Sequence, residues 1–222
     1  MFDALHHTPE VAAYLGAELD PLADAPDFDH LVEIGCGSGL HLDWAVERGL
    51  HYDGLDLVAQ LVDEGRARLA ELARPHDHAR HRRFHLGSAE DLGTLWSAAG
   101  LEGRHHGAIL AFPFNCAGSL AHPETALGAA ARTQARIYIS VFAASRPATA
   151  CRLAYYARCG YAALATTDTE HGVLVTSLEG LRSFAYHERH LVELLARSSY
   201  VLERRSELAG VGIGLLFAPA SG

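Results

Sequence analysis

The 222-residue sequence contains no lysine, so all 18 of its Lys and Arg positions are arginines, against 27 acidic residues. The formal net charge is therefore −9 at pH 7 with histidine neutral. Proteins that bind the phosphate backbone of nucleic acids carry clustered basic charge. The charge balance argues against a nucleic-acid partner.

Long hydrophobic runs are also missing. No stretch approaches the ~18 uninterrupted apolar residues of a transmembrane helix, and residues 1–7 lack the basic and apolar segments of a secretory signal. The four cysteines, at positions 36, 116, 151 and 159, form no C-x-x-C pair. We therefore expect a cytoplasmic protein with free thiols, no membrane span and no metal site.

Strand-like and helix-like segments alternate along most of the chain. Apolar segments at 31–34, 52–57, 83–86, 108–112 and 136–142 are typical of strands, and the segments at 9–19, 40–48, 58–74 and 123–132 are typical of helices. This alternation predicts a parallel sheet covered by helices on both faces.

The C-terminal third has a different pattern. A helix at 147–159 precedes a hairpin with strands at 162–167 and 173–176, and a helix at 188–197 precedes strands at 200–207 and 212–218. A short turn joins the last two strands, so they should be antiparallel. The inserted hairpin would lie above the carboxyl ends of the parallel strands, where such sheets bind ligands.

The strongest motif is V-E-I-G-C-G-S-G at 32–39, between the first expected strand and the first expected helix. Its glycines permit a sharp turn and the close approach of a ligand, and the following helix presents free N–H groups there. The dinucleotide pattern G-x-G-x-x-G would need glycine where Leu40 stands. Glu33, just before the turn, favours a cationic ligand over a pyrophosphate.

The next expected strand ends at Asp56. A carboxylate at this position can accept two hydrogen bonds from a ribose diol. It could instead cap the helix that begins near residue 58. Asp53, within the same strand, is expected to be exposed to solvent.

Two further segments follow the third and fourth expected strands. The polar turn at 87–91 can hydrogen-bond an adenine ring or simply cap a helix. In the segment at 111–118, Phe112 and Phe114 can form a ligand wall or join the core, and Asn115 supplies one directed polar group.

These four segments, in this order and spacing, resemble the class I S-adenosylmethionine (SAM)-dependent methyltransferases. The resemblance covers residues 28–142 well and the last helix and strand pair in outline. It implies an α/β, Rossmann-like fold whose seven-stranded mixed sheet has the order 3-2-1-4-5-7-6, with strand 7 antiparallel and the hairpin inserted after strand 5. The chain 1–222 would be one domain, with an N-terminal helical cap at 1–27 and a substrate-covering insertion at 146–186.

The resemblance also implies SAM as cofactor and assigns roles to individual residues. The cofactor residues would be Tyr14, Glu33, Gly35, Cys36, Gly37, Gly39, Asp56, Leu57, Ser88, Ala89, Glu90 and Phe112. The substrate residues would be Phe114, Arg152, Tyr155, Tyr156 and Arg182, and the catalytic residues Asn115 and His7. The two arginines could hold a carboxylate substrate, or lie on a helix surface while the tyrosines pack. Ser88 stands where the family's adenine turn usually has Asp.

The expected reaction is methyl transfer to a nitrogen, oxygen or carboxylate of a small molecule in specialised metabolism, by in-line displacement in a closed cleft. Residues 112–115 lack the Asn-Pro-Pro-aromatic motif of base and glutamine methylases. The candidate bases are His6, His7, His122, His171 and His187. The same motifs would fit SAM cyclisation, aminocarboxypropyl transfer or a non-catalytic SAM-binding subunit, and a nicotinamide oxidoreductase less well. A homodimer stays open, and neither nucleic acid nor membrane is expected as a partner.

Overall fold

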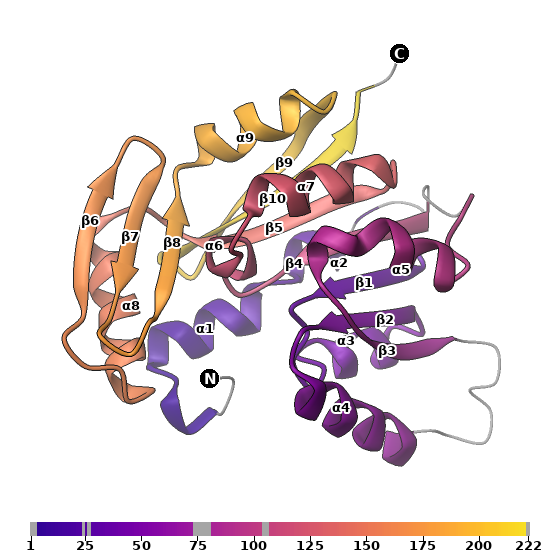
Figure 1. Ribbon diagram of the computed structural model, residues 1–222, viewed down its shortest axis with the longest axis horizontal. Helices are drawn as coiled ribbons and strands as arrows, with labels where there is room; N and C mark the ends of the chain where they lie inside the picture. Colours follow the sequence, from indigo (N-terminus) through magenta and orange to yellow (C-terminus); the bar gives the residue numbers. More distant parts are fainter. Residues whose placement is uncertain (1–3, 24, 26–27, 73–80, 104–106, 221–222) are drawn as a thin grey trace.

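The structure is a computed structural model that describes residues 4–23, 25, 28–72, 81–103 and 107–220. Its core is a seven-stranded sheet in the order β3-β2-β1-β4-β5-β10-β9 (Figure 1). The strands are β1 His30–Ile34, β2 His51–Asp56, β3 Arg82–Leu86, β4 Ala108–Phe112, β5 Arg136–Phe142, β9 Tyr200–Leu208 and β10 Gly212–Pro219. β1 to β5 run parallel, and β10 is antiparallel to β5 and β9. Counted within this sheet alone, the strands have the predicted order 3-2-1-4-5-7-6.

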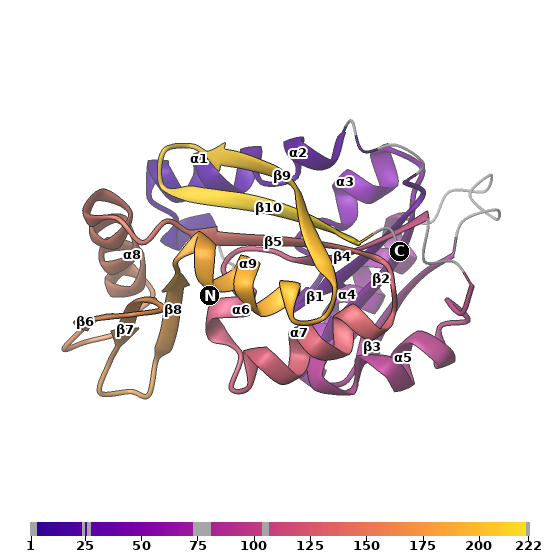
Figure 2. The same ribbon diagram turned by 90° about the horizontal axis from the view of Figure 1, so that it is seen from above.

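Helices cover both faces of this sheet, as the alternating pattern predicts (Figure 2). Helices α2 (Asp20–Ala23), α3 (Leu42–Glu47) and α4 (Ala59–Leu72) lie on one face and bury Leu22, Leu42, Ala45 and Val62 there. Helices α5 (Leu92–Ala98), α7 (Pro123–Arg132) and α9 (Glu188–Ala196) lie on the other. The small side chains of α7 let it pack closely, because its inner face is almost entirely alanine. The predicted helix at 58–74 ends at Leu72, and its residues 73 and 74 lie outside the described residues.

A third layer lies beyond the carboxyl ends of the strands. It contains η1 (Ala4–His6), α1 (Pro9–Ala17) and α8 (Arg146–Arg158), and a third apolar cluster joins α1 to α8. Both helices begin as their sequences dictate. Thr8 and Ser145 cap them by accepting backbone N–H groups, and a proline occupies the first turn of each. Within the predicted cap at 1–27, residues 1–3, 24, 26 and 27 lie outside the described residues.

The insertion after β5 is a three-stranded antiparallel sheet and not the predicted hairpin. Its strands are β6 (Ala165–Thr169), β7 (Gly172–Thr176) and β8 (Arg182–Tyr186), in that order (Figure 1). β8 was missed because four of its five residues are buried. A strand buried on both faces shows no alternation of apolar and polar residues. The third strand connects the insertion directly to α9.

Asp53 is fully buried, which corrects the expectation that it is exposed. It lies in the interior strand β2, and its carboxylate accepts hydrogen bonds from His30 (2.7 Å), His85 (2.6 Å) and Arg83 (3.1 Å) on the two neighbouring strands. Burial alone would raise the pKa of Asp53, but these partners lower it to about 2. A buried carboxylate with this many donors is stable in its charged form.

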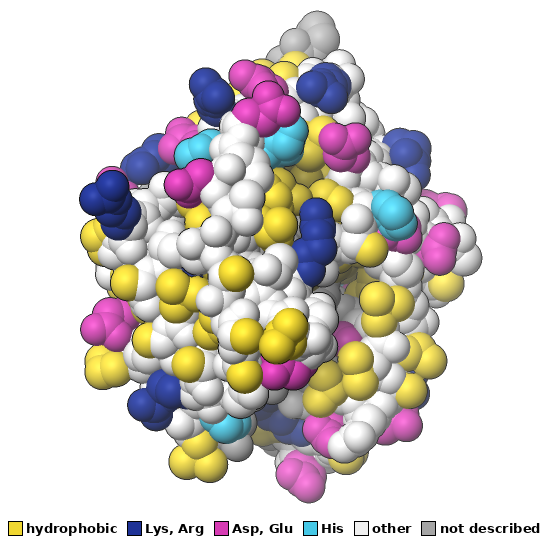
Figure 3. Space-filling model, turned by 60° about the vertical axis from the view of Figure 1, so that its left-hand side comes forward, with side chains coloured by type: hydrophobic (Ala, Val, Ile, Leu, Met, Phe, Trp, Pro, Cys, Tyr) yellow, Lys and Arg dark blue, Asp and Glu magenta, His cyan; other side chains and the backbone are white. Residues whose placement is uncertain are grey.

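On the described surface that faces the viewer in Figure 3, arginine, acidic and apolar side chains are intermixed. Within the described chain, the model contains no helix that is both long enough and apolar enough to cross a bilayer.

Candidate functional site

The glycine motif forms a tight turn at the carboxyl end of β1. Gly35, Gly37 and Gly39 have φ values of 71°, 55° and 93°, which are costly for residues with a Cβ. A Cβ on Gly35 would also lie 2.7 Å from the sulfur of Cys116. The turn continues to His41, so α3 begins at Leu42 and not at residue 40.

Asp56 connects this turn to the next helix. One carboxylate oxygen accepts the N–H of Gly37 (2.8 Å) and the other accepts the N–H of Val58 (2.9 Å). Val58 precedes the first residue of α4, Ala59, so Asp56 holds the approach to this helix and, among the described residues, accepts no N–H of its first turn. A carboxylate has about four lone-pair positions, so two remain available to a ligand hydroxyl pair.

A cavity of about 220 Å³ lies between these loops. It is lined by Ile34, Gly35, Leu55, Asp56, Leu57, Val58, Gly87, Ala89, Cys116 and Leu120. The structure thus brings together four of the predicted cofactor residues: Gly35, Asp56, Leu57 and Ala89. Pockets for whole ligands usually measure roughly 300–1,000 Å³, so this one suits one end of a larger ligand. We call it the nucleoside pocket, because the sequence predicts a ribose at Asp56 and an adenine at the turn after β3.

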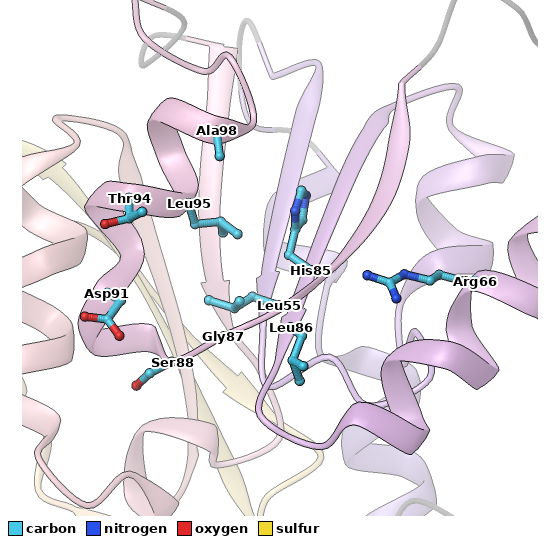
Figure 4. Close-up of a pocket in the computed structure, with 10 residues that line it drawn as sticks. All are labelled: Leu55, Arg66, His85, Leu86, Gly87, Ser88, Asp91, Thr94, Leu95 and Ala98. Carbon is cyan, nitrogen blue, oxygen red and sulfur yellow. The ribbon is translucent and has the colours of Figure 1, made fainter.

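The turn after β3 separates the nucleoside pocket from a second cavity of about 460 Å³ (Figure 4). Both cavities are lined by Leu55 and Gly87, but Ser88 lines only the second and Ala89 only the first. Ser88 also caps the short η2 helix (Ala89–Asp91) by accepting the N–H of Glu90 (3.2 Å). Ser88 therefore caps a helix, which was one of the two roles predicted for the turn at 87–91.

Several predicted cofactor residues turn their side chains into the core. Phe112 is fully buried in the apolar cluster that includes residues of α5 and α7. Cys36 packs under the glycine turn, where its thiol donates to the carbonyl of Gly37, and burial raises the pKa of this thiol. Gly39 provides space for the ring of Phe84 and for Leu42.

Glu33 is fully buried beside the glycine turn. Its Oε2 accepts the hydroxyl of Tyr52 (2.5 Å) and the backbone N–H of His41 (3.3 Å), whereas Oε1 has no hydrogen-bond partner among the described residues. Burial raises the pKa of Glu33 above its ordinary value, although the hydrogen bonds from Tyr52 and His41 act in the opposite direction. The atom Oε1 is a buried acceptor that a ligand cation nearby would stabilise.

Glu18 is a functional candidate that the sequence reading missed. It follows α1, is fully buried, and accepts His41 Nε2 (2.8 Å) and the backbone N–H of Phe114 (2.5 Å). Burial disfavours the charged imidazole of His41, but its hydrogen bond to Glu18 and the charges of Glu18 and Glu33 raise its pKa overall. No local signal identified Glu18, because its partners are distant in sequence.

Aromatic rings from α1, β5, α8 and the link between η1 and α1 surround Phe114. Their ring centroids lie 5.9 Å (Tyr14), 6.0 Å (Phe142), 5.5 Å (Tyr155) and 6.3 Å (His7) from that of Phe114. Tyr14 and Tyr155 are fully buried. The structure therefore brings the predicted residues Tyr14, His7, Phe114 and Tyr155 into one cluster at the carboxyl edge of the sheet.

Asn115 connects this cluster to the inserted sheet. Its amide donates to the hydroxyl of Ser183 (3.0 Å), which also contacts the hydroxyl of Tyr156 (2.6 Å). Arg152 is fully buried, and donates to the carbonyl groups of Val173 (3.2 Å) and Ser183 (2.7 Å). The surface alternative for Arg152 is therefore wrong.

Two predicted residues lie apart from these clusters. Arg182, at the start of β8, is exposed, and Glu90 is half-buried in η2. Within the described ranges no group of three or more His, Cys, Asp or Glu side chains could hold a metal ion.

No protein-family model matches this sequence, and no curated protein sequence matches it. Solved structures do match. The magnesium protoporphyrin IX methyltransferase of Synechocystis PCC 6803 with bound SAH has a TM-score of 0.61 at 13% identity, over 93% of this chain and 82% of that one. The CcbJ methyltransferase of Streptomyces caelestis has a TM-score of 0.58 at 14% identity, over 99% of both chains.

A third structure is the 1,6-didemethyltoxoflavin-N1-methyltransferase of Burkholderia thailandensis, with bound 1,6-didemethyltoxoflavin and S-adenosylhomocysteine. Its TM-score is 0.59 at 15% identity, over 95% of this chain and 85% of that one. At such identities the likeness concerns the fold. With its sheet order and its glycine turn, the chain has the fold of the class I SAM-dependent methyltransferases.

Proposed function

We propose that this protein is a SAM-dependent methyltransferase that acts on a small-molecule acceptor in specialised metabolism. The observation that carries the proposal is the nucleoside pocket, where the glycine turn, the carboxylate of Asp56 and the turn after β3 converge. This convergence lies at the carboxyl ends of parallel strands, where open α/β sheets bind their ligands.

The residues present fit SAM. Gly35 lines the nucleoside pocket with backbone alone, and Asp56 retains acceptor capacity for a ribose diol. Beside the glycine turn, the buried Glu33 accepts only neutral donors, the Tyr52 hydroxyl and the backbone N–H of His41, and its Oε1 has no partner among the described residues. Such a carboxylate favours a positively charged group nearby. Bound SAM would supply a methyl carbon already activated by its sulfonium.

The protein's own contribution is then orientation and the exclusion of water. An acceptor must be held in line with the methyl group, at about 3 Å, in a site shielded from solvent. The cap and the insertion provide the shield, since Tyr14, Phe114 and Tyr155 are buried between them. We assign His7, at the edge of this cluster, as the base for a hydroxyl acceptor. Arg152, Tyr155, Tyr156 and Arg182 remain proposed substrate residues.

The small size of the acceptor is supported by the neighbours of the same fold, whose acceptors are a magnesium porphyrin and a didemethyltoxoflavin. All four cysteines are free, which supports a reducing, cytoplasmic location.

Calorimetric titration with SAM and with S-adenosylhomocysteine tests the proposal, with NAD as control. Mass spectrometry of SAM incubated with the protein, alone and with a panel of small acceptors, then identifies the product. Micromolar binding with S-adenosylhomocysteine formed only when an acceptor is present is the expected result. Release of methylthioadenosine would instead indicate chemistry at another SAM carbon, and absence of binding would overturn the proposal.

A further inference from the structure

The corner after β4 has an unusual backbone. Phe114 and Asn115 have φ values of 44° and 59°, in the left-handed region that residues with a Cβ rarely adopt. Asn tolerates this region, but Phe does not, and strained residues persist only when their surroundings hold them. Both residues are buried. Specific contacts must therefore fix this corner.

One side of the corner is held by Ser183 of the inserted sheet. Because Asn115 Oδ1 accepts the N–H of Phe142 (3.3 Å), its amide nitrogen is the donor to Ser183 Oγ (3.0 Å). Arg152 Nη2 donates to the same oxygen (3.3 Å). With both lone pairs of Oγ used, the Ser183 hydroxyl hydrogen must point to Tyr156 Oη (2.6 Å). The direction of every hydrogen bond around Ser183 is thus determined.

The other side is held by Glu18 of the cap. The backbone N–H of Phe114 donates to Glu18 Oε1 (2.5 Å), and the Ser140 hydroxyl donates to the same oxygen. The second oxygen of Glu18 bonds His41 Nε2 (2.8 Å), which fixes the rotamer of the carboxylate. A charged acceptor makes hydrogen bonds roughly twice as strong as a neutral one.

The inserted sheet also touches the corner directly. A Cβ on Gly118, in α6 (Cys116–Ser119), would lie 1.9 Å from the carbonyl oxygen of Phe184 and 2.6 Å from the Asn115 amide nitrogen. Only glycine allows this approach. The cap and the insertion therefore meet at the same two residues, although they lie far apart in sequence.

We propose that Glu18 and Ser183 are positioning residues that clamp the Phe114–Asn115 corner in its left-handed conformation, and so set the wall against which the acceptor is oriented. The role in orienting an acceptor rests on the proposed function, whereas the contacts that hold the corner do not depend on it. Orientation of the acceptor then depends on both the cap and the insertion. The side chains of Glu18 and Ser183 act through the corner and not by contact with the reacting atoms.

The experiment compares Glu18→Gln and Ser183→Ala with wild type, with Glu188→Gln and Ser97→Ala as matched controls on the surface. Hydrogen–deuterium exchange is followed by mass spectrometry in full-length protein, over peptides that contain residues 113–119. We expect exchange there to accelerate roughly tenfold in both clamp variants and in neither control, while peptides from α4 and β9 are unchanged. Ser183→Thr keeps the hydroxyl and should therefore show the slow exchange of wild type over residues 113–119. This variant provides the test if Ser183→Ala does not fold.

Binding and turnover give the second readout. The clamp variants should bind S-adenosylhomocysteine within about threefold of wild type, because the nucleoside pocket is intact. With an acceptor found by the panel, kcat should fall more than the KM for SAM rises. Unchanged exchange at the corner, or acceleration spread over the whole chain, overturns the clamp. Failure of wild type to bind S-adenosylhomocysteine overturns the proposed function instead.

Discussion

At the residue scale, the carboxylate of Asp56 links backbone geometry to ligand binding. It already accepts the N–H groups of Gly37 and Val58, so it holds the glycine turn and the start of α4 in register. It also lines the pocket between these loops and has acceptor capacity left for a ligand. One side chain therefore affects both the stability and the affinity of the protein.

Asp56→Ala is expected to weaken SAM binding by about 1–3 kcal/mol through loss of two hydrogen bonds, which is roughly 5–150-fold in Kd. The loss of the acceptor for the N–H groups of Gly37 and Val58 should also lower the free energy of unfolding by ~1 kcal/mol. Calorimetry and urea denaturation measure the two effects. Asp63→Ala, on the exposed face of α4, is the control. Unchanged SAM affinity in a folded Asp56→Ala protein would remove this residue from the site.

At the element scale, a row of polar side chains crosses β1, β2 and β3 through the buried Asp53. The pKa of Asp53 is lowered from the ordinary 3.8 to about 2, which amounts to roughly 2.5 kcal/mol at ~1.36 kcal/mol per unit. A lowered pKa means that the folded state binds the proton less readily than the unfolded state. The contribution is therefore complete above pH 4 and is lost as the pH falls towards 2.

Urea unfolding at several pH values between 7 and 2 measures this dependence. Wild type should lose about 1.5–2 kcal/mol more than Asp53→Asn over the interval from pH 4 to pH 2, because the amide has no proton to bind. Asp53→Asn should itself be less stable than wild type at pH 7, since it presents a poorer partner to Arg83 and the two histidines. Parallel pH curves for the two proteins would show that Asp53 is not the responsible group.

The same elements show what the sequence can and cannot predict. Strands β1, β2, β4 and β5 are short strand-like runs between helices, so their parallel direction followed from pattern and from the handedness of crossovers, whereas their order was implied by the resemblance to the methyltransferases. β8 was hidden because its burial on both faces removes the alternation that marks a strand. A charged residue is expected at the surface when only the sequence is known, because few Asp side chains are fully buried. For this reason Asp53 was predicted to be exposed, although it is fully buried.

The candidate site also has one part that the sequence predicts and one part that it does not. The glycine turn, Asp56 and the turn after β3 are local motifs, and their convergence is visible from sequence once the strands are placed. The contacts of Glu18 and Ser183 are not, because they join residues 96 and 68 positions apart in the chain. Such pairs depend on how the cap and the insertion pack, which no local pattern specifies.

At the scale of the whole molecule, the loops that form the nucleoside pocket belong to the main sheet, whereas the acceptor side is built from the cap and the insertion. A ligand that binds the folded chain and not the unfolded chain raises the free energy of unfolding. The stabilisation equals RT ln(1 + [L]/Kd), or about 2.7 kcal/mol at a hundredfold excess over Kd. For a chain of this length, 1 kcal/mol shifts Tm by roughly 2–4 °C.

S-adenosylhomocysteine at a hundredfold excess over its Kd should consequently raise Tm by about 5–11 °C, with a logarithmic dependence on concentration. NAD at the same concentration should cause no comparable shift, because Glu33 and Leu40 disfavour a pyrophosphate at the glycine turn. Asp56→Ala should move the concentration dependence to higher ligand without changing its slope. Differential scanning fluorimetry over a range of concentrations measures all three curves. A protein that unfolds cooperatively but shows no shift with S-adenosylhomocysteine would have the methyltransferase fold without its cofactor site.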